Sequence, residues 1–566
     1  MSYKGFLSQS KVSKEEQEFY DLKNKAAEYF RSNGVPQKIE GVLNEMFWQK
    51  PDDIYGYLAN YFSGLSQTPV ISKITGKEVF DRRGLTAVQV EVHCILRNEE
   101  KISLCLSLCP CLFCLLSIAL FVLANPADDV ASEEAVSNRA GQHLSIRTAL
   151  KWIREELSPM LQGLNPADQT SVDKLLSDFC TVRYLEHKEI LDREDELRSA
   201  SLSEDPPQVT PTPVLSKDKK GKKVNSSEKL LPPAEPPVPR LPGATAVGVL
   251  SLAVAKTAAR LLGTPLYQHA QNEAHLPVPI LTVLSCGKSS AGKLNLVQEV
   301  LIIPSSSQKV KESVVYVLAL QVIDMGLELQ REMMRILNGL ANKAGSVNVS
   351  EEGALQVGFE RTEQAFDLVT EACANLGFPL GSDLRLALNY ELVEVYEGLI
   401  TKYPSIRSII DPFRKEDVEQ WEKLASVMGE SCSIIADVAA NVGPCWSQGK
   451  TFPSGTTGVI IRHDGDMTIS DLFRIIAENK DAETILAADC CDSSIVDLAV
   501  GSGVPFLKLT GLRGAERMDK YNRLMAIEEE LEQKGILGAR EIEPPQSELP
   551  ETSEGTSSSV CLTIPQ

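Results

Sequence analysis

Long helical segments with periodic apolar residues alternate with short β-rich runs in the second half of the chain, downstream of Ala244. The apolar β-rich runs lie at residues 281–284, 300–303, 405–410, 433–435, 459–461 and 484–487. Strands that alternate with helices pair in parallel, and ~250 residues of such alternation suit a closed barrel. The pattern therefore predicts a β/α barrel, which we assign to residues 277–540.

Two apolar stripes at helical spacing lie between residues 35 and 65. The first contains Ile39, Val42, Leu43, Met46 and Phe47, and the second contains Ile54, Leu58, Tyr61, Phe62 and Leu65. Pro51 and the acids after it indicate a turn followed by a helix start. The pattern predicts a helical hairpin within residues 1–68. So short a hairpin cannot bury both stripes, so we expect it to dimerise or to pack on the rest of the chain.

Residues 102–124 form an apolar run of 23 residues without a charged side chain. That length would cross a hydrocarbon core of ~30 Å. The run begins soon after an alternating strand pattern at residues 86–92, inside what is otherwise the sequence of a water-soluble domain. Its cysteines are candidate ligands for a soft metal, although Leu and Cys in an apolar run more often simply bury. We therefore favour an insert over a membrane span.

Two further segments are too polar to order themselves. Residues 198–241 are dense in Pro, Ser and Lys, which predicts a disordered insert, and residues 541–566 predict a flexible tail. The whole chain of 566 residues is 43% apolar and 24% charged, as in a globular protein of several units.

A net charge of −20 argues against general nucleic-acid binding, because phosphate contacts need a basic surface. The 13 cysteines form no small-domain disulfide framework, and the first residues lack the apolar core of a secretory signal. We expect a cytoplasmic protein.

Charged side chains lie next to several of the predicted strands or between them. In order they are Glu299, Glu351, Glu352, Asp383, Asp411, Asp437, Arg462 and Lys508. The chemistry of a β/α barrel lies at the carboxyl ends of its strands. Carboxylates there can hold Mg²⁺ and cations can hold a phosphorylated acid. Taken one at a time, each is more often a helix cap or a surface ion pair.

The order and surroundings of these residues resemble the enolase family across most of residues 70–95 and 145–540. Residues 77–90 (KEVFDRRGLTAVQV) look like the opening strand of the family with its DSRGNPTVEV motif. Further similar segments follow in family order at residues 157–169, 243–254, 405–413, 495–501 and 516–529. The resemblance implies an enolase-type β/α barrel preceded by an α+β domain, which we place at residues 69–276.

Enolases dehydrate 2-phosphoglycerate to phosphoenolpyruvate with a lysine base, a glutamic acid and two Mg²⁺ ions. By resemblance, Glu352 matches the acid of the family's GDEGG motif and Glu299 matches the glutamate that supports it. Lys508 matches the substrate-binding lysine. Asp383 and Asp437 match two of the three carboxylates that hold the catalytic metal. The implied cofactor is Mg²⁺, and the implied ligands are 2-phosphoglycerate and phosphoenolpyruvate.

Two positions depart from the family pattern at its chemical centre. Ile410 replaces the glutamate of the SIEDPF motif and offers no lone pair, so Mg²⁺ should bind more weakly unless Asp411 or water fills the place. Arg462 replaces the catalytic lysine of LLLK, and a guanidinium stays protonated. Losing a positioned base costs ~10²- to 10⁴-fold in rate. Arg462 can still bind an anion, and a shift of one residue would bring His463 forward as a base.

Three family loops are also changed. Residues 488–493 replace the phosphate-binding SHRSGET loop and exchange positive charge for negative, and residues 285–293 lose the histidine of NGGSHAGN. The SGAST lid, which coordinates the second Mg²⁺, has no counterpart.

Residues 35–62 resemble the dimerisation and docking domain of cAMP-dependent kinase regulatory subunits. In that family two hairpins form a four-helix bundle whose groove binds an amphipathic anchoring helix. The resemblance implies an anchoring partner for residues 35–65. The alternative is a hairpin that packs on the enolase-like part of the same chain.

Two classes of function follow. One is an enolase-like hydro-lyase with a partly degraded site. The other is a catalytically weak or inactive structural protein, like the divergent enolase-like proteins of vertebrate sperm, that anchors glycolytic enzymes in the flagellum. A third reading joins them, because enolases are dimers: a homodimer, or a heterodimer with an intact enolase.

Overall fold

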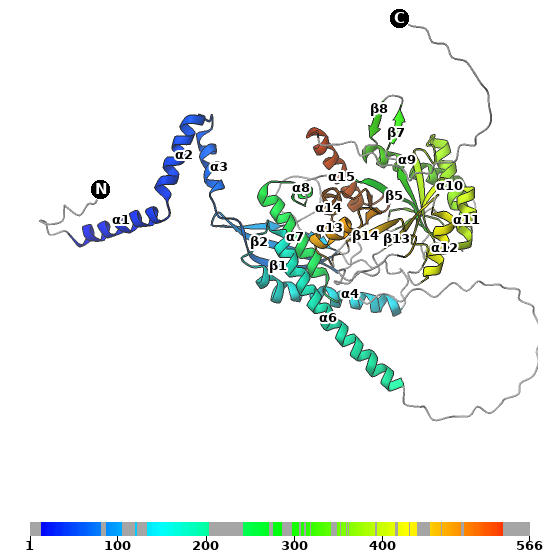
Figure 1. The fold of residues 1–566 in the computed structure, drawn as a ribbon, viewed down its shortest axis with the longest axis horizontal. Helices are drawn as coiled ribbons and strands as arrows, with labels where there is room; N and C mark the ends of the chain where they lie inside the picture. The colour runs from blue at the N-terminus through cyan, green and yellow to red at the C-terminus, as the bar shows by residue number, and fades with distance from the viewer. Residues whose placement is uncertain are drawn as a thin grey trace, which may run out of the picture. The chain divides into compact units, whose positions relative to one another are not determined.

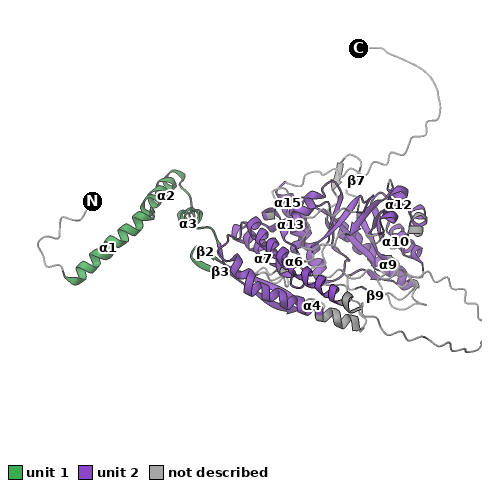
Figure 2. Ribbon diagram, turned by 60° about the horizontal axis from the view of Figure 1, so that its bottom comes forward, with its two compact units in different colours: residues 1–69, 95–100 green, residues 70–94, 101–566 purple. Residues whose placement is uncertain are grey.

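The structure is a computed structural model of the full chain, which separates into two compact units (Figure 2). Unit 1 comprises residues 1–69 and 95–100, and unit 2 comprises residues 70–94 and 101–566. The described residues are 13–80, 86–104, 119–121, 133–202, 241–270, 275–285, 297–304, 307–310, 313–316, 319–340, 348–350, 353–357, 359, 361–390, 393–413, 417–429, 431–437, 453–463, 465, 467–487 and 492–535. The predicted tail, most of the predicted linker and most of the apolar run lie outside them.

Unit 1 is built from three helices, α1 (Lys14–Ser32), α2 (Val35–Gln49) and α3 (Ile54–Gly64). Helices α2 and α3 are the expected hairpin, and α1 was not predicted. Helix α1 begins with a capping box, in which Ser13 and Glu16 satisfy each other's backbone N–H groups. The Asp53 side chain caps α3 by accepting from the N–H of Gly56 at 2.8 Å.

The first part of unit 2 is an α+β domain. Its sheet has the order β1-β2-β3, with β4 also paired to β2. The strands are β1 (Val70–Phe80), β2 (Thr86–Leu96), β3 (Glu99–Leu104) and β4 (Ala119–Phe121). The helices are α4 (Glu133–Trp152), a π-helical turn (Ile153–Leu157), α5 (Ser158–Leu161), α6 (Gln169–Leu202), α7 (Thr245–Leu262) and α8 (Leu266–Ala270).

Parts of the apolar run and of the predicted linker form regular secondary structure in this domain. Residues 102–104 and 119–121 of the apolar run belong to the strands β3 and β4, and β4 pairs antiparallel with β2, with Val88 opposite Phe121. Helix α6 continues into the predicted linker as far as Leu202. Among the described residues one helix, α7, is long and apolar enough to cross a membrane, yet 78% of that stretch is buried inside the protein. Helix α7 is therefore a core helix.

The second part of unit 2 is a closed barrel, as predicted. Its strands are β5 (Val278–Ser285), β6 (Val297–Pro304), β11 (Leu384–Tyr390), β12 (Ile406–Ile410), β13 (Ser433–Asp437), β14 (Gly458–Arg462), β15 (Glu483–Ala487) and β16 (Phe506–Lys508). They pair in this order, and β16 pairs with β5 to close the barrel. Strand β6 is antiparallel to both its neighbours, whereas the other pairs are parallel.

Helices surround the barrel (Figure 1). They are α9 (Ala319–Leu340), α10 (Thr362–Leu376), α11 (Val393–Lys402), α12 (Val418–Met428), α13 (Ile469–Glu478), α14 (Ser494–Ser502) and α15 (Ala515–Gln533). Short strands β9 (Asn348–Val349) and β10 (Leu355–Gln356) extend the sheet beside β5, and β7 (Ser307–Val310) pairs with β8 (Ser313–Tyr316).

Aliphatic side chains fill the inside of the barrel. The cluster consists of Ile280, Leu301, Ile303, Ala387, Ile410, Ile435, Ile460, Ile485 and Ala487, all buried. The strands contribute these residues as inward-facing layers, so the barrel is a packed core and not a pore. Ile410 belongs to this core.

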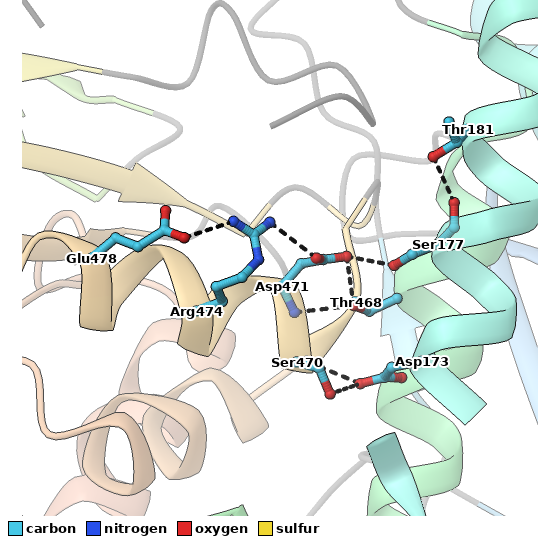
Figure 3. Close-up of polar contacts among 8 residues, drawn as sticks. All are labelled: Asp173, Ser177, Thr181, Thr468, Ser470, Asp471, Arg474 and Glu478. Atoms are coloured by element: carbon cyan, nitrogen blue, oxygen red, sulfur yellow. Dashed lines mark hydrogen bonds and ion pairs between the residues drawn. The ribbon is translucent and has the colours of Figure 1, made fainter. Parts of the chain in front are cut away.

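A buried carboxylate joins the α+β domain to the barrel (Figure 3). Asp173 on α6 accepts hydrogen bonds from the side chains of Gln169 (2.8 Å) and Ser251 (2.6 Å), and from the backbone N (2.9 Å) and hydroxyl (2.7 Å) of Ser470 on α13. Burial raises the pKa of Asp173, and the hydrogen bonds from Ser251, Ser470 and Gln169 act in the opposite direction. Oδ1 of the carboxylate thus accepts two hydrogen bonds within the α+β domain, and Oδ2 accepts two from the barrel.

We expect the Asp173→Ala variant to lose about 2–5 kcal/mol of unfolding free energy, because it leaves several buried donors without an acceptor. The measurement is the urea concentration at the midpoint of unfolding, compared between variants whose unfolding transitions have the same m-value. Asp178→Ala, on the exposed side of the same helix, is the matched control and should shift stability by less than about 0.5 kcal/mol. Equal midpoints for the two variants would contradict the interface role.

Candidate functional site

Four charged side chains meet at one end of the barrel. Asp437, Arg462 and Lys508 are the last residues of the parallel strands β13, β14 and β16. Glu299 lies near the start of β6, but β6 runs antiparallel, so its start lies at the same end. The barrel thus gathers four of the predicted site residues at the carboxyl end of its parallel strands.

Lys508 and Glu299 form a buried ion pair across the barrel mouth. The Lys508 Nζ lies 2.5 Å from Glu299 Oε2, and the two side chains are only 6% and 13% exposed. Strand β5 lies between β16 and β6, so the pair bridges two strands that are not neighbours. The predicted substrate lysine and the glutamate predicted to support Glu352 are therefore in direct contact.

Arg462 forms a forked ion pair with Asp437 on the adjacent strand. Its Nη2 and Nε lie 2.6 and 3.0 Å from Asp437 Oδ2, and Nε lies 3.3 Å from Oδ1. The side chains are 23% and 15% exposed. Because a guanidinium stays protonated, Arg462 donates hydrogen bonds here and cannot remove a proton as a general base. The residue at the expected base position is thus bound to an expected metal ligand.

Ile410 is buried among aliphatic side chains. Its side chain is 1% exposed and belongs to the barrel core described above. The next residue, Asp411, has a φ of 48° and donates its backbone N–H to the carbonyl of Ile435 at 2.8 Å. Aspartate adopts this left-handed region more readily than most residues with a side chain.

Asp383 does not reach this end of the barrel, which corrects the predicted metal set. It directly precedes β11, and β11 runs parallel to β12, so Asp383 lies at the amino end. The strand rise places Asp383 and Asn389 ~20 Å apart. Asn389 is the residue of β11 that lies opposite Ile410 on one side and Glu299 on the other. The alternating apolar pattern of residues 384–388 was the signal that could have identified this strand.

The donor set does not fit the divalent cation that the family uses. The three strand-end positions carry an amide (Asn389), a hydrocarbon (Ile410) and a carboxylate (Asp437) that already accepts from Arg462. Mg²⁺ prefers anionic or carbonyl oxygen ligands in octahedral geometry. Over the part of the chain that the structure describes, no group of three or more His, Cys, Asp or Glu residues is arranged to hold a metal ion. We therefore derive no step through Mg²⁺.

The predicted acid Glu352 lies outside the described residues, but its neighbour Gly353 is firmly held. The carbonyl of Gly353 accepts from Gln330 Nε2 at 3.1 Å and from the backbone N of Leu512 at 3.2 Å. Gly353 has a φ of 78°, and a side chain there would collide with the carbonyl of Arg513. These contacts fix the chain next to Glu352 against the loop that follows β16.

His463, the alternative base, is buried behind the site. It is 1% exposed, and burial lowers its pKa to about 4, so the ring is neutral at pH 7. Nearby, Asp492 pairs with Lys256 of α7, whose Nζ lies 2.7 Å from Asp492 Oδ2. Burial by itself would raise the pKa of Asp492, but the charge and hydrogen bonds of Lys256, aided by Ser494, hold it below its ordinary value.

A closed barrel with one antiparallel strand and charged residues at its carboxyl end is the frame of a β/α-barrel enzyme family. The sequence matches the family described as "Enolase, C-terminal TIM barrel domain" over residues 273–390 and 382–544. The chain is 64% identical to the Danio rerio protein named Enolase 4, over 97% of each chain.

More distant relatives with the same name agree. The chain is 37% identical to Enolase 4 of Xenopus laevis, over 93% of this chain and 95% of the relative. It is 36% identical to Enolase 4 of Homo sapiens, over 93% and 90%. This chain belongs to the enolase family.

Burial of His463 should make stability depend on pH. The folded state disfavours the protonated ring, so the contribution is fully present above pH 6.5 and is lost as pH falls toward about 4. We expect the unfolding free energy of the wild type to fall more steeply over this window than that of His463→Phe, by about 2–3 kcal/mol in total. Denaturant titrations at several pH values measure this difference.

The matched control is His187→Phe, since His187 is partly exposed on α6. Its pH profile should parallel that of the wild type. Parallel profiles for the wild type and His463→Phe would show instead that the buried ring does not titrate in this range.

Proposed function

We propose that this protein is an enolase-type hydro-lyase of strongly reduced turnover, acting on 2-phosphoglycerate and phosphoenolpyruvate. The observation that carries the proposal is the pair of Lys508 and Glu299 at the carboxyl end of the barrel. It supplies the cation that a phosphorylated acid requires and a carboxylate that orients this cation. Family membership supports the same reaction class.

The reduction in rate follows from the state of Arg462. A guanidinium cannot accept the proton at C2, and losing a positioned base costs ~10²- to 10⁴-fold. Its Nε and Nη2 are engaged with Asp437, so an anionic ligand must compete with that carboxylate for these two nitrogens. Lys508 is similarly engaged with Glu299. The chain's own residues can thus hold and orient an anionic acid better than they can deprotonate it.

We expect purified protein to form phosphoenolpyruvate slowly from 2-phosphoglycerate, and Lys508→Met to reduce this rate at least tenfold, because Glu299 then has no cation and the substrate loses its partner. The measurement is the ultraviolet absorbance of the product. Lys480→Met, an exposed lysine just before β15, is the control and should leave the rate unchanged. Turnover that is absent, or that Lys508→Met does not alter, would contradict the proposal.

A second function is favoured by unit 1. In its three helices only Val42 is buried, while many large apolar side chains are exposed. These are Phe19, Leu22, Tyr29, Phe30, Ile39, Leu43, Phe47, Trp48, Ile54, Tyr55, Phe62 and Leu65. An exposed apolar set of this size marks an interaction surface. We propose that helices α2 and α3 pair with a second copy of the chain and present residues 35–65 to an amphipathic anchoring helix, consistent with an assembly role in a cytoplasmic scaffold such as the flagellum.

Charge placed on this surface should separate the copies. We expect the full-length wild type to sediment as a dimer and Leu43→Glu to shift toward monomer by at least tenfold in dissociation constant, because the carboxylate would be buried without a partner. Gln37→Glu, exposed on the same helix, is the control and should remain dimeric. A dimer that persists in Leu43→Glu would place the contact in the barrel, and a monomeric wild type would also overturn the proposal.

A further inference from the structure

The guanidinium of Arg462 lies where a barrel of this family is expected to need a cation. It contacts Asp437 through two nitrogens, at 2.6 and 3.0 Å from the same carboxylate oxygen. We propose that Arg462 takes the place of the divalent cation at Asp437, so that the barrel mouth is a metal-free site with a built-in positive charge. The proposal concerns the same site as the proposed hydro-lyase activity, but it rests on ion binding and not on turnover.

The donor positions support this replacement. Of the three strand-end positions, Asp437 alone carries a carboxylate, Ile410 is buried in the aliphatic core, and Asn389 carries a neutral amide. A hard divalent cation needs several oxygen ligands and binds more weakly as the number of anionic ones falls. A guanidinium needs only one carboxylate, and Arg462 is held by Asp437 through two nitrogens that share one oxygen. The remaining residues therefore suit an arginine and not a metal.

The charges of the site are consistent with the same conclusion. Asp437 is paired to Arg462 and Glu299 is paired to Lys508, so each of these two carboxylates already has a cation without an added ion. A divalent cation at Asp437 would have to displace the guanidinium and then remain close to it. The repulsion between the guanidinium and the added cation would be strong, because the Arg462 and Asp437 side chains are largely shielded from water.

Ile410 and Arg462 are mutually compatible in charge. A carboxylate at position 410 would place a second negative charge in the packed aliphatic layer beside Ile435, which is costly unless a cation neutralises it. An isoleucine there removes that cost once the metal is gone. Ile410 and Arg462 thus form a consistent pair of changes, each of which makes the other favourable.

The test measures metal binding to the full chain. We expect the melting temperature of the wild type to stay unchanged at millimolar Mg²⁺, because a ligand that does not bind the folded state does not stabilise it. Mn²⁺ added alone, followed by water proton relaxation, reports the same site independently. A saturable signal in the wild type that Asp437→Asn abolishes would overturn the proposal.

A reconstructed site supplies the positive arm. The variant Asn389→Asp, Ile410→Glu, Arg462→Lys restores three strand-end carboxylates and removes the guanidinium. We expect it to bind Mg²⁺ at least ~100-fold more tightly than the wild type, and adding Asp437→Asn to the variant should reverse the gain. Circular dichroism checks that each variant is folded.

The single variant Arg462→Met covers the case in which the reconstructed chain does not fold. It should show a weak Mn²⁺ relaxation signal that the wild type lacks, because Asp437 is then open to a cation. If both folded variants bind no more metal than the wild type, Arg462 is not the reason for the absence of binding, and the proposal fails. Turnover enters neither arm, so a failure here differs from a failure of the proposed activity.

Discussion

The pairing of β16 with β5 is the constraint on which the site depends. It places Lys508 beside Ile280 and closes the ring of strands. Because β6 runs against its neighbours, closure also brings Glu299 from the start of its strand to the ends of the others. An ion pair between residues 209 positions apart then forms across β5. Without closure, five strands would separate β16 from β6, and Lys508 could not reach Glu299.

Buried carboxylates in this acidic protein are paired with nearby cations. With a net charge of −20, each buried carboxylate needs a local cation or several donors. Lys508 serves Glu299, Arg462 serves Asp437, and Lys256 serves Asp492. The last pair also joins helix α7 of the α+β domain to the barrel. The cations that a family member would direct at its substrate are thus used inside this protein to neutralise carboxylates.

Much of the fold could be predicted from the sequence, because apolar periodicity reports burial directly. It gave the barrel and the hairpin of α2 and α3, but it missed α1, which has no buried residue to impose a pattern. The site was predicted less completely. The structure brings Glu299, Asp437, Arg462 and Lys508 to one end of the barrel, whereas Asp383 directly precedes β11 and lies at the other end. The ion pair of Arg462 with Asp437 depends on the register between β13 and β14, and a local sequence motif does not determine that register.

The two units differ in how much of their apolar surface is buried. The inside of the barrel buries a cluster of aliphatic side chains, and two ion pairs neutralise charges at its carboxyl end. Unit 1 leaves Phe47 and Trp48 exposed on a helix that buries only Val42. Apolar surface that the chain does not cover itself favours association, because removing it from water is the main driving force for contact between proteins. The proposed contact with a partner therefore rests on the exposed apolar residues of the N-terminal helices, and the proposed activity rests on the charged residues of the barrel.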